Sequence, residues 1–197
     1  MTFPVQWVDP SKKVEEFTPK ARLRFHPLAK ALESVEVEEH GWETVKNLVT
    51  HYGLGKARLF FIGNGGSAAV ASHMAIDWMK NGGFATFGPG DAAYMTCIGN
   101  DHGFPNVYAH LVHRHGQLGD VLFAVSSSGM SDNILLAVEM AISQKMNVVT
   151  LSGFGPGNFL RNKGQVNFYV PSTQYGTVEI SHLAILHSIL DEVMETA

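Results

Sequence analysis

The chain has 197 residues, of which 45% are hydrophobic and 16% are charged, and its formal net charge is −4. This composition is typical of a single globular domain with a substantial core. The low charge and the lack of a basic run argue against nucleic acid as a direct ligand. The sequence shows neither a membrane span of roughly 18 apolar residues nor the pattern of a signal peptide. We therefore expect a cytoplasmic protein that binds neither nucleic acid nor membranes.

The single cysteine, Cys97, lies in an apolar segment, residues 94–98. We expect its thiol to be buried and inert, because a disulfide framework needs a second cysteine. The absence of disulfides also fits a reducing compartment.

Residues 1–26 carry mixed charge and early prolines, and we expect them to form an N-terminal arm. Between about residues 27 and 52, the apolar spacing indicates one or two helices with a break at Gly41. From residue 57 onward, strand and helix patterns alternate. We expect strands at 58–62, 93–98, 120–125, 147–151 and 166–170, and helices at 67–80, 104–114, 132–145, 157–163 and 176–195.

Such alternation predicts an α/β fold in which right-handed crossovers build a five-stranded parallel sheet. Helices then cover both faces of the sheet, which makes a three-layer sandwich. We expect residues 27–197 to form one domain that follows the N-terminal arm. The helices predicted between residues 27 and 52 would form an N-terminal helical extension of the sandwich.

The most informative segment is Ser126-Ser127-Ser128-Gly129-Met130-Ser131, which lies between a predicted buried strand and a predicted helix. Such a bend presents free backbone N–H groups, the positive end of a helix dipole and several hydroxyl donors to one point. An ordinary helix N-cap needs only one serine. Four serines in six residues therefore indicate a site for a phosphoryl group.

A second turn, Gly63-Asn64-Gly65-Gly66-Ser67, lies between another predicted strand and helix. Its glycines allow a tight bend and a close approach of ligand to backbone. The spacing differs from the dinucleotide fingerprint, and no Gly-Lys-Ser/Thr follows as in a P-loop. Because both turns follow the carboxyl ends of parallel strands, we expect them at the edge of the sheet where ligands bind.

Three further segments carry a family resemblance together with these two turns: residues 99–104, 149–153 and 179–187. In this order and spacing, over about residues 27–195, they resemble the sugar isomerase (SIS) domain family. The resemblance is strongest to the phosphoheptose isomerases, which convert sedoheptulose 7-phosphate to a heptose phosphate. It implies a flavodoxin-like sheet and a homotetramer with active sites between subunits. It also implies no nucleotide cofactor.

The resemblance assigns expected roles to individual residues of this chain. The sugar phosphate would be held by Ser67, Ser126, Ser127, Ser128 and Ser131. The sugar chain would be bound by Asn64, Asp101 and Glu179.

The resemblance also implies that Asp77 and His187 carry the proton transfers, with Asp77 standing where the family has a glutamate. The shorter side chain withdraws the carboxylate by about one carbon–carbon bond, and a misplacement near 1 Å can cost on the order of a hundredfold in rate. Zinc or another divalent metal would be held by His73, Asp77, Glu179 and His187, with Glu179 in place of a glutamine. His73 and Asp77 share one face of the predicted helix. A metal-free interpretation, in which His73 packs and the carboxylates are solvated, stays open.

Other positions depart from the family pattern in the part that binds the sugar. A Thr-Gly-Arg segment of the family becomes Met79-Lys80-Asn81, and an Asp-Arg pair becomes Gly176-Thr177. The expected function is a phosphosugar aldose–ketose isomerase similar to sedoheptulose 7-phosphate isomerase and assisted by a metal. One alternative is isomerisation of a different phosphosugar. Another is a non-catalytic SIS protein that binds phosphosugars or acts as an adaptor of the bacterial replication initiator.

Overall fold

The structure is a computed structural model that describes residues 19–51 and 57–195. The N-terminal arm expected over residues 1–26 lies outside the described residues up to residue 18, and residues 19–26 belong to the first helix. The elements, in chain order, are α1 (Pro19–Glu33), α2 (Gly41–Thr50), β1 (Arg58–Gly63), α3 (Gly66–Lys80), β2 (Ala85–Phe87), α4 (Ala92–His102), the 3₁₀ helix η1 (Phe104–Asn106), α5 (Val107–His115), β3 (Val121–Ser126), α6 (Asp132–Ser143), β4 (Asn147–Ser152), the 3₁₀ helix η2 (Leu160–Asn162), β5 (Val166–Tyr169) and α7 (Tyr175–Glu195).

The five strands form one parallel sheet in the order β2-β1-β3-β4-β5. This is the flavodoxin-like order, in which β2 is added on one side of β1 and the later strands are added on the other, so the strand order reverses between β1 and β3. The expected α/β architecture is therefore confirmed. The inner strands are almost wholly buried, and β1 and β3 are mostly apolar, as expected for strands covered on both faces.

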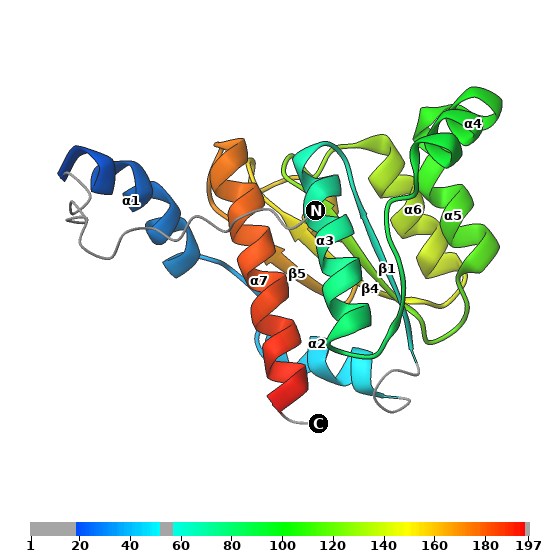
Figure 1. The fold of residues 1–197 in the computed structure, drawn as a ribbon, viewed down its shortest axis with the longest axis horizontal. Helices are drawn as coiled ribbons and strands as arrows, with labels where there is room; N and C mark the ends of the chain where they lie inside the picture. The colour runs from blue at the N-terminus through cyan, green and yellow to red at the C-terminus, as the bar shows by residue number, and fades with distance from the viewer. Residues whose placement is uncertain (1–18, 52–56, 196–197) are drawn as a thin grey trace, which may run out of the picture.

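Helices cover both faces of the sheet (Figure 1). Because side chains alternate along a strand, Leu59 and Phe61 join the core under α2, α3 and α7. Phe60 and Ile62 join a second core under α5 and α6. The outcome is the three-layer sandwich that the sequence predicts.

The expected strand at 93–98 is wrong, because this segment belongs to helix α4. The Asp91 carboxylate accepts a hydrogen bond of 2.8 Å from the Tyr94 backbone N–H and so caps the start of this helix. The second strand is instead β2, a three-residue edge strand too short to leave a clear pattern in the sequence. Of the expected helix at 157–163, only the three-residue η2 forms.

The expectation for Cys97 is also wrong, because its side chain is exposed on α4. Its Sγ lies 3.7 Å from the Asp101 carboxylate one helical turn further on. The apolar neighbours of Cys97 predict burial only if the segment is a strand covered on both faces. On a helix, consecutive side chains point to different sides, so Cys97 can face solvent while Ile98 is buried.

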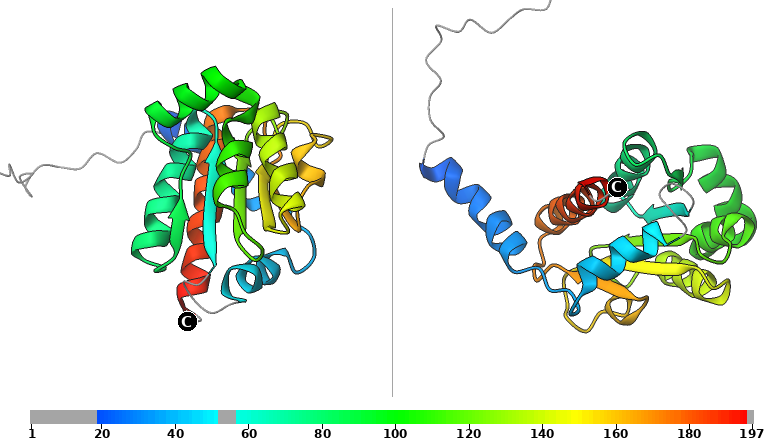
Figure 2. Two further views of the ribbon diagram at one scale, coloured as in Figure 1. Left: turned by 90° about the vertical axis from the view of Figure 1, so that its right-hand side faces the viewer. Right: turned by 90° about the horizontal axis from the view of Figure 1, so that it is seen from below.

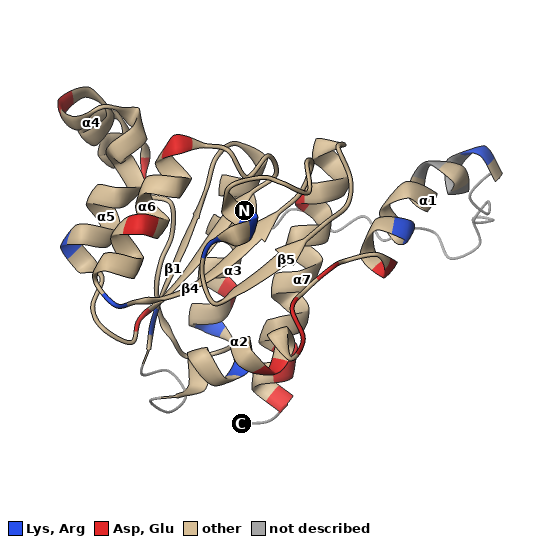
Figure 3. Cartoon of the chain, turned by 180° about the vertical axis from the view of Figure 1, so that it is seen from behind, with Lys and Arg blue, Asp and Glu red and all other residues tan. Residues whose placement is uncertain are grey.

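Helix α1 projects away from the sandwich (Figure 2). Its side chains Leu23 and Phe25 are 70% and 57% exposed. The expected domain start at residue 27 falls within this helix, which the structure shows as continuous. Lys and Arg residues are dispersed over several helices and loops in the view of Figure 3. No helix of the described residues is long and apolar enough to cross a membrane.

An ion pair fixes β1 and β3 at their N-terminal ends. The Arg58 guanidinium donates from Nε and Nη2 to the two oxygens of Asp120, at 3.1 and 2.6 Å. The Gln117 backbone N–H donates to the same carboxylate at 2.8 Å. The polar groups at the N-terminal ends of β1 and β3 are therefore paired with one another. The carboxyl ends of these strands are left for ligands.

His182 lies within α7, fully buried against the carboxyl end of β4. Its Nε2 lies 3.1 Å from the Ser152 carbonyl oxygen, and its Nδ1 has no partner among the described residues. Burial lowers the pKa of His182 from 6.5 to about 4, although the hydrogen bond to Ser152 opposes the shift. The imidazole is therefore neutral in the folded protein at pH 7 and donates from Nε2.

This lowered pKa predicts a loss of stability in acid. The unfolded chain binds the proton near pH 6.5 and the folded chain only near pH 4, so the stabilisation is complete above 6.5 and is lost as the pH falls towards 4. Between pH 7 and pH 5 we expect the free energy of unfolding to fall by about 2 kcal/mol more in the unmodified protein than in His182→Gln. Urea denaturation at the two pH values measures this difference. The exposed His113→Gln is the control and should keep the full decrease, whereas an equal decrease in His182→Gln would contradict the assignment.

Candidate phosphate cup and metal-binding cluster

The two hydroxyl-bearing turns meet at the carboxyl ends of neighbouring strands. Gly63 at the end of β1 pairs with Val125 near the end of β3, so the segments that follow leave the sheet side by side. This is the point where the strand order reverses, and ligands of such sheets bind there. The turns enclose a cavity of about 380 Å³, which we call the serine cup. It is lined by Asn64, Gly65, Gly66, Ser67, Ser126, Ser127, Ser128, Ser131, Tyr175 and Glu179.

The cup has hydroxyl groups that local structure does not use. Ser127 Oγ is buried and has no hydrogen-bond partner among the described residues. Ser131 is the N-cap residue of α6, yet its side chain makes no capping hydrogen bond. Ser126 and Ser128 accept bonds from the backbone N–H groups of Gly129 and Met130, which leaves their O–H groups free to donate. A buried hydroxyl without a partner is costly, so this set favours a bound acceptor such as a phosphoryl group.

The serine turn is braced from behind by Asn158. The Asn158 side chain is buried, and its Nδ2 donates to the carbonyls of Gly153 and Gly155 at 3.1 and 2.9 Å. Gly129 adopts a φ of 63°, and a Cβ there would collide with Asn158. The backbone of Leu160 donates to the Gly129 carbonyl at 3.0 Å. Only glycine at position 129 therefore allows the turn to lie this close to its support.

Asn64 and Asn133 join the two turns to each other. Each side chain donates its Nδ2 to the other's Oδ1, both at 2.8 Å. Asn133 is buried in the first turn of α6. Asn64 lines the cup, but its amide is already paired with Asn133 and holds the two turns together. Sequence reasoning missed Asn133, because an asparagine after a serine turn is indistinguishable from an ordinary solvated helix residue.

The cup contains one carboxylate, Glu179, and no lysine or arginine among its lining residues. Glu179 is half-buried, and its carboxylate packs on Gly66, where a Cβ would collide with it. An anion in the cup would be stabilised by neutral hydroxyl and N–H donors and by the N-terminal ends of α3 and α6.

The structure does not bring Asp101 to the cup of its own chain. Asp101 is exposed on α4, where its oxygens accept bonds from the Asn100 amide at 2.8 Å and from the Cys97 thiol. A role in sugar binding therefore needs a second subunit.

A cluster of possible metal ligands lies further along α3 and α7, and it consists of His73, Asp77 and His187. The two imidazole Nε2 atoms are 3.1 Å apart. Asp77 Oδ2 is 3.2 Å from His73 Nε2 and 3.8 Å from His187 Nδ1. Two imidazoles and one carboxylate that converge, with an open position left over, form a donor set typical of catalytic zinc. The residues present therefore fit a divalent metal.

Glu179 does not belong to this cluster in the described structure. It precedes His187 by eight residues, about 12 Å of helix rise, and lies at the serine cup. Three of the four metal ligands implied by the resemblance are thus brought together, and the fourth is directed to the phosphate region.

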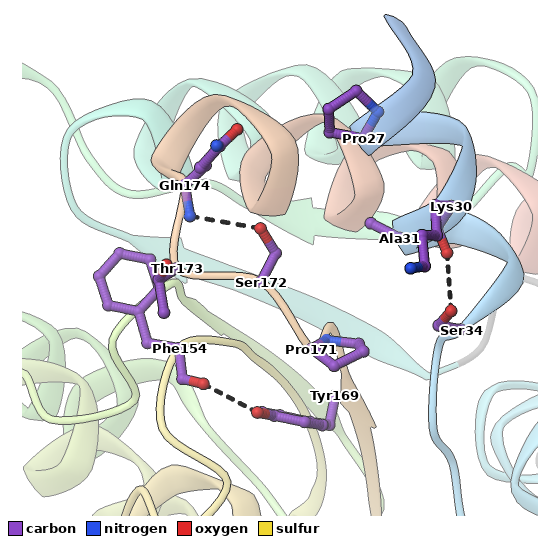
Figure 4. Close-up of a pocket in the computed structure, with 10 residues that line it drawn as sticks. All are labelled: Pro27, Lys30, Ala31, Ser34, Phe154, Tyr169, Pro171, Ser172, Thr173 and Gln174. Carbon is purple, nitrogen blue, oxygen red and sulfur yellow. Dashed lines mark hydrogen bonds between the residues drawn. The ribbon is translucent and has the colours of Figure 1, made fainter.

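A larger cavity of about 440 Å³ lies between α1 and the segment from β5 to α7 (Figure 4). Pro27, Lys30, Phe154 and Pro171 are among the residues that line it. Two of its polar side chains are already engaged, because Ser34 donates to the Lys30 carbonyl and Tyr169 donates to the Phe154 carbonyl. It lies beside β5, away from the carboxyl ends of β1 and β3 where the strand order reverses, so the smaller serine cup is the stronger candidate for phosphate.

Ser127→Ala tests the cup directly. The change removes a free buried donor without creating an unpaired group, so we expect the affinity for inorganic phosphate to fall about three- to tenfold. Isothermal titration calorimetry measures the affinity, and Ser143→Ala on the exposed side of α6 is the matched control. Unchanged phosphate affinity in Ser127→Ala would contradict the role of this hydroxyl.

The family model and the similar curated proteins point to the same family. The sequence model described as "SIS domain" matches residues 25–153. The phosphoheptose isomerase of Colwellia psychrerythraea is 30% identical over 181 residues, which cover 83% of this chain and 91% of the relative. That of Rhodospirillum rubrum is 37% identical over 139 residues, which cover 66% of this chain and 72% of the relative.

Solved structures show the same relationship. The phosphoheptose isomerase of Neisseria gonorrhoeae has a TM-score of 0.76 and 28% identity, and the match covers 88% of this chain and 97% of that one. The phosphoheptose isomerase of Francisella tularensis has a TM-score of 0.73 and 26% identity, with coverage of 90% and 97%. The chain belongs to the SIS domain family and, within it, to the phosphoheptose isomerase family.

Proposed function

We propose that this chain is a cytoplasmic aldose–ketose isomerase that converts sedoheptulose 7-phosphate to an aldoheptose 7-phosphate. The observation that carries the proposal is that two helices bear both halves of the site. Helix α3 carries Ser67 of the cup and His73 and Asp77 of the cluster. Helix α7 carries Glu179 and His187, and the two helices pack against each other. The relatives named phosphoheptose isomerase support this reaction.

The spacing of the two halves supports a long substrate. His73 follows Ser67 by six residues, about 9 Å of helix rise. A sugar held by its phosphate in the cup must span several carbon–carbon bonds before its carbonyl end reaches the cluster. This favours a seven-carbon sugar over a triose.

The reaction needs a base and an acid. In the proposed mechanism, the Asp77 carboxylate removes the proton from C1 of the open-chain ketose and returns it to C2 of the enediol. His187 moves the compensating proton between O2 and O1. Asp77 Oδ2 and His187 Nδ1 are 3.8 Å apart, which is close enough for both groups to act on one pair of adjacent substrate carbons. A metal held by His73, Asp77 and His187 would supply Lewis-acid polarisation of the substrate carbonyl.

The proposal includes assembly with further copies of the chain, with four copies as the expected number. Apolar side chains are exposed on the two helices that carry the site: Ile76 is 55% and Met79 49% exposed on α3, and Ile180 is 51% exposed on α7. Exposed apolar groups of this kind are typical of interfaces. Light scattering of the purified chain tests this, because the mass of a single chain would argue against a site between subunits.

The activity test uses sedoheptulose 7-phosphate with and without added zinc. We expect conversion to an aldoheptose phosphate, observed by NMR of the sugar protons. His187→Asn should lower kcat by about a hundredfold or more, because it removes acid–base catalysis, while the substrate affinity changes little. His113→Asn, at an exposed position on α5, is the control.

The outcomes separate the alternatives. No turnover by the unmodified protein, together with measurable sugar phosphate binding, would favour a non-catalytic binding or adaptor role. Equal losses of binding and turnover in His187→Asn would contradict its role in proton transfer.

Zinc affinity tests the metal proposal without reference to activity. His73→Asn should weaken zinc binding at least about tenfold, because it removes one of three converging donors, as measured by competition with a chromophoric chelator. His40→Asn at an exposed position is the control. Glu179→Gln should leave zinc affinity unchanged if the three-residue set is correct. A loss equal to that of His73→Asn would instead support the four-residue set.

A further inference from the structure

Phe154, in the segment after β4, has an unusual backbone conformation. Its φ is 57°, in the left-handed region that bulky side chains rarely adopt. Two hydrogen bonds hold it there. Its N–H donates to the Ser172 carbonyl at 2.9 Å, and its own carbonyl accepts from the Tyr169 hydroxyl at 2.8 Å (Figure 4). Strain that is fixed in this way is commonly found at functional sites.

The strained residue supports a second aromatic ring at the mouth of the serine cup. The Phe154 and Tyr175 ring centroids are 4.8 Å apart at an angle of 71°, a favourable edge-to-face geometry. Tyr175 is the first residue of α7 and lines the cup. Its side chain is nevertheless 62% exposed. The Phe154 ring thus contacts the Tyr175 ring on one side, while more than half of the residue stays exposed.

Packing into the core does not explain this arrangement, because so much of the Tyr175 ring is exposed. A fixed aromatic surface beside a polar cavity suits a ligand with both C–H and hydroxyl groups. One helical turn further on, Glu179 presents a carboxylate for which the structure gives no hydrogen bond or ion pair among the described residues. Tyr175 and Glu179 thus offer an apolar face and a hydrogen-bond acceptor to the same side of the cup.

We propose that Tyr175, held in place by Phe154, binds the carbon chain of the phosphosugar and so selects for the sugar rather than for phosphate. The inference rests on the proposed phosphosugar-binding function of the cup. The phosphate lies among the serines, and the C–H groups of the sugar pack on the Tyr175 ring as the chain leaves the cup.

The test compares two ligands, inorganic phosphate and sedoheptulose 7-phosphate, by calorimetry. In Tyr175→Ala the affinity for sedoheptulose 7-phosphate should fall about three- to tenfold, while the affinity for inorganic phosphate stays the same. Tyr175→Phe keeps the ring and should retain most of the sugar phosphate affinity. Leu118→Ala, at a 70% exposed position just before β3 at the opposite end of the sheet, is the control.

Three results would overturn the inference: unchanged affinity for both ligands in Tyr175→Ala, equal loss for both, or a change in the oligomeric mass of the variant. The last result would show that Tyr175 contacts a second copy of the chain. If the unmodified protein binds neither ligand, the proposed function of the cup itself fails, which is a distinguishable outcome.

Discussion

The site depends on the adjacency of β1 and β3 in the parallel sheet. The strand order reverses there, so two strand-to-helix turns project from the same edge without a helix between them. The Asn64–Asn133 amide pair then fixes one turn to the other, and Asn158 supports the serine turn from behind. The hydroxyl groups converge because the backbone around them is held by bonds that involve no ligand. Such preorganisation spares the protein the cost of ordering the loops when an anion binds.

Charge separates the site into two parts. The serine cup offers an anion neutral donors and helix ends, while the groups suited to proton transfer and metal binding gather further along α3 and α7. Because no lysine or arginine lines the cup, a phosphate group of the product would be bound less tightly than in a cationic site and could be released. The Glu179 carboxylate adds a negative charge to the cup, which disfavours binding of phosphate alone. Under the proposed function, part of the affinity would then come from the sugar, for which we propose Tyr175 as a contact.

The sequence allowed most of the fold and the meeting of the two hydroxyl-bearing turns to be predicted, because strong local patterns determine both. Long apolar runs mark β1, β3 and β4, and glycine and serine clusters mark the turns after β1 and β3. β2 could not be predicted because its three residues owe their pairing to the edge of an existing sheet. The pairing of Asn133, the direction of Glu179 and the exposure of Tyr175 depend on contacts between distant segments. Local spacing carries no information about such contacts.

The most direct test of the central claim is a crystal structure of the protein soaked with sedoheptulose 7-phosphate. The account predicts the phosphorus atom in the serine cup, within hydrogen-bond reach of Ser67, Ser127 and Ser131, with the carbon chain directed along α3 and α7 towards His187. A phosphate found in the larger cavity between α1 and residues 171–174, with an empty cup, would contradict it.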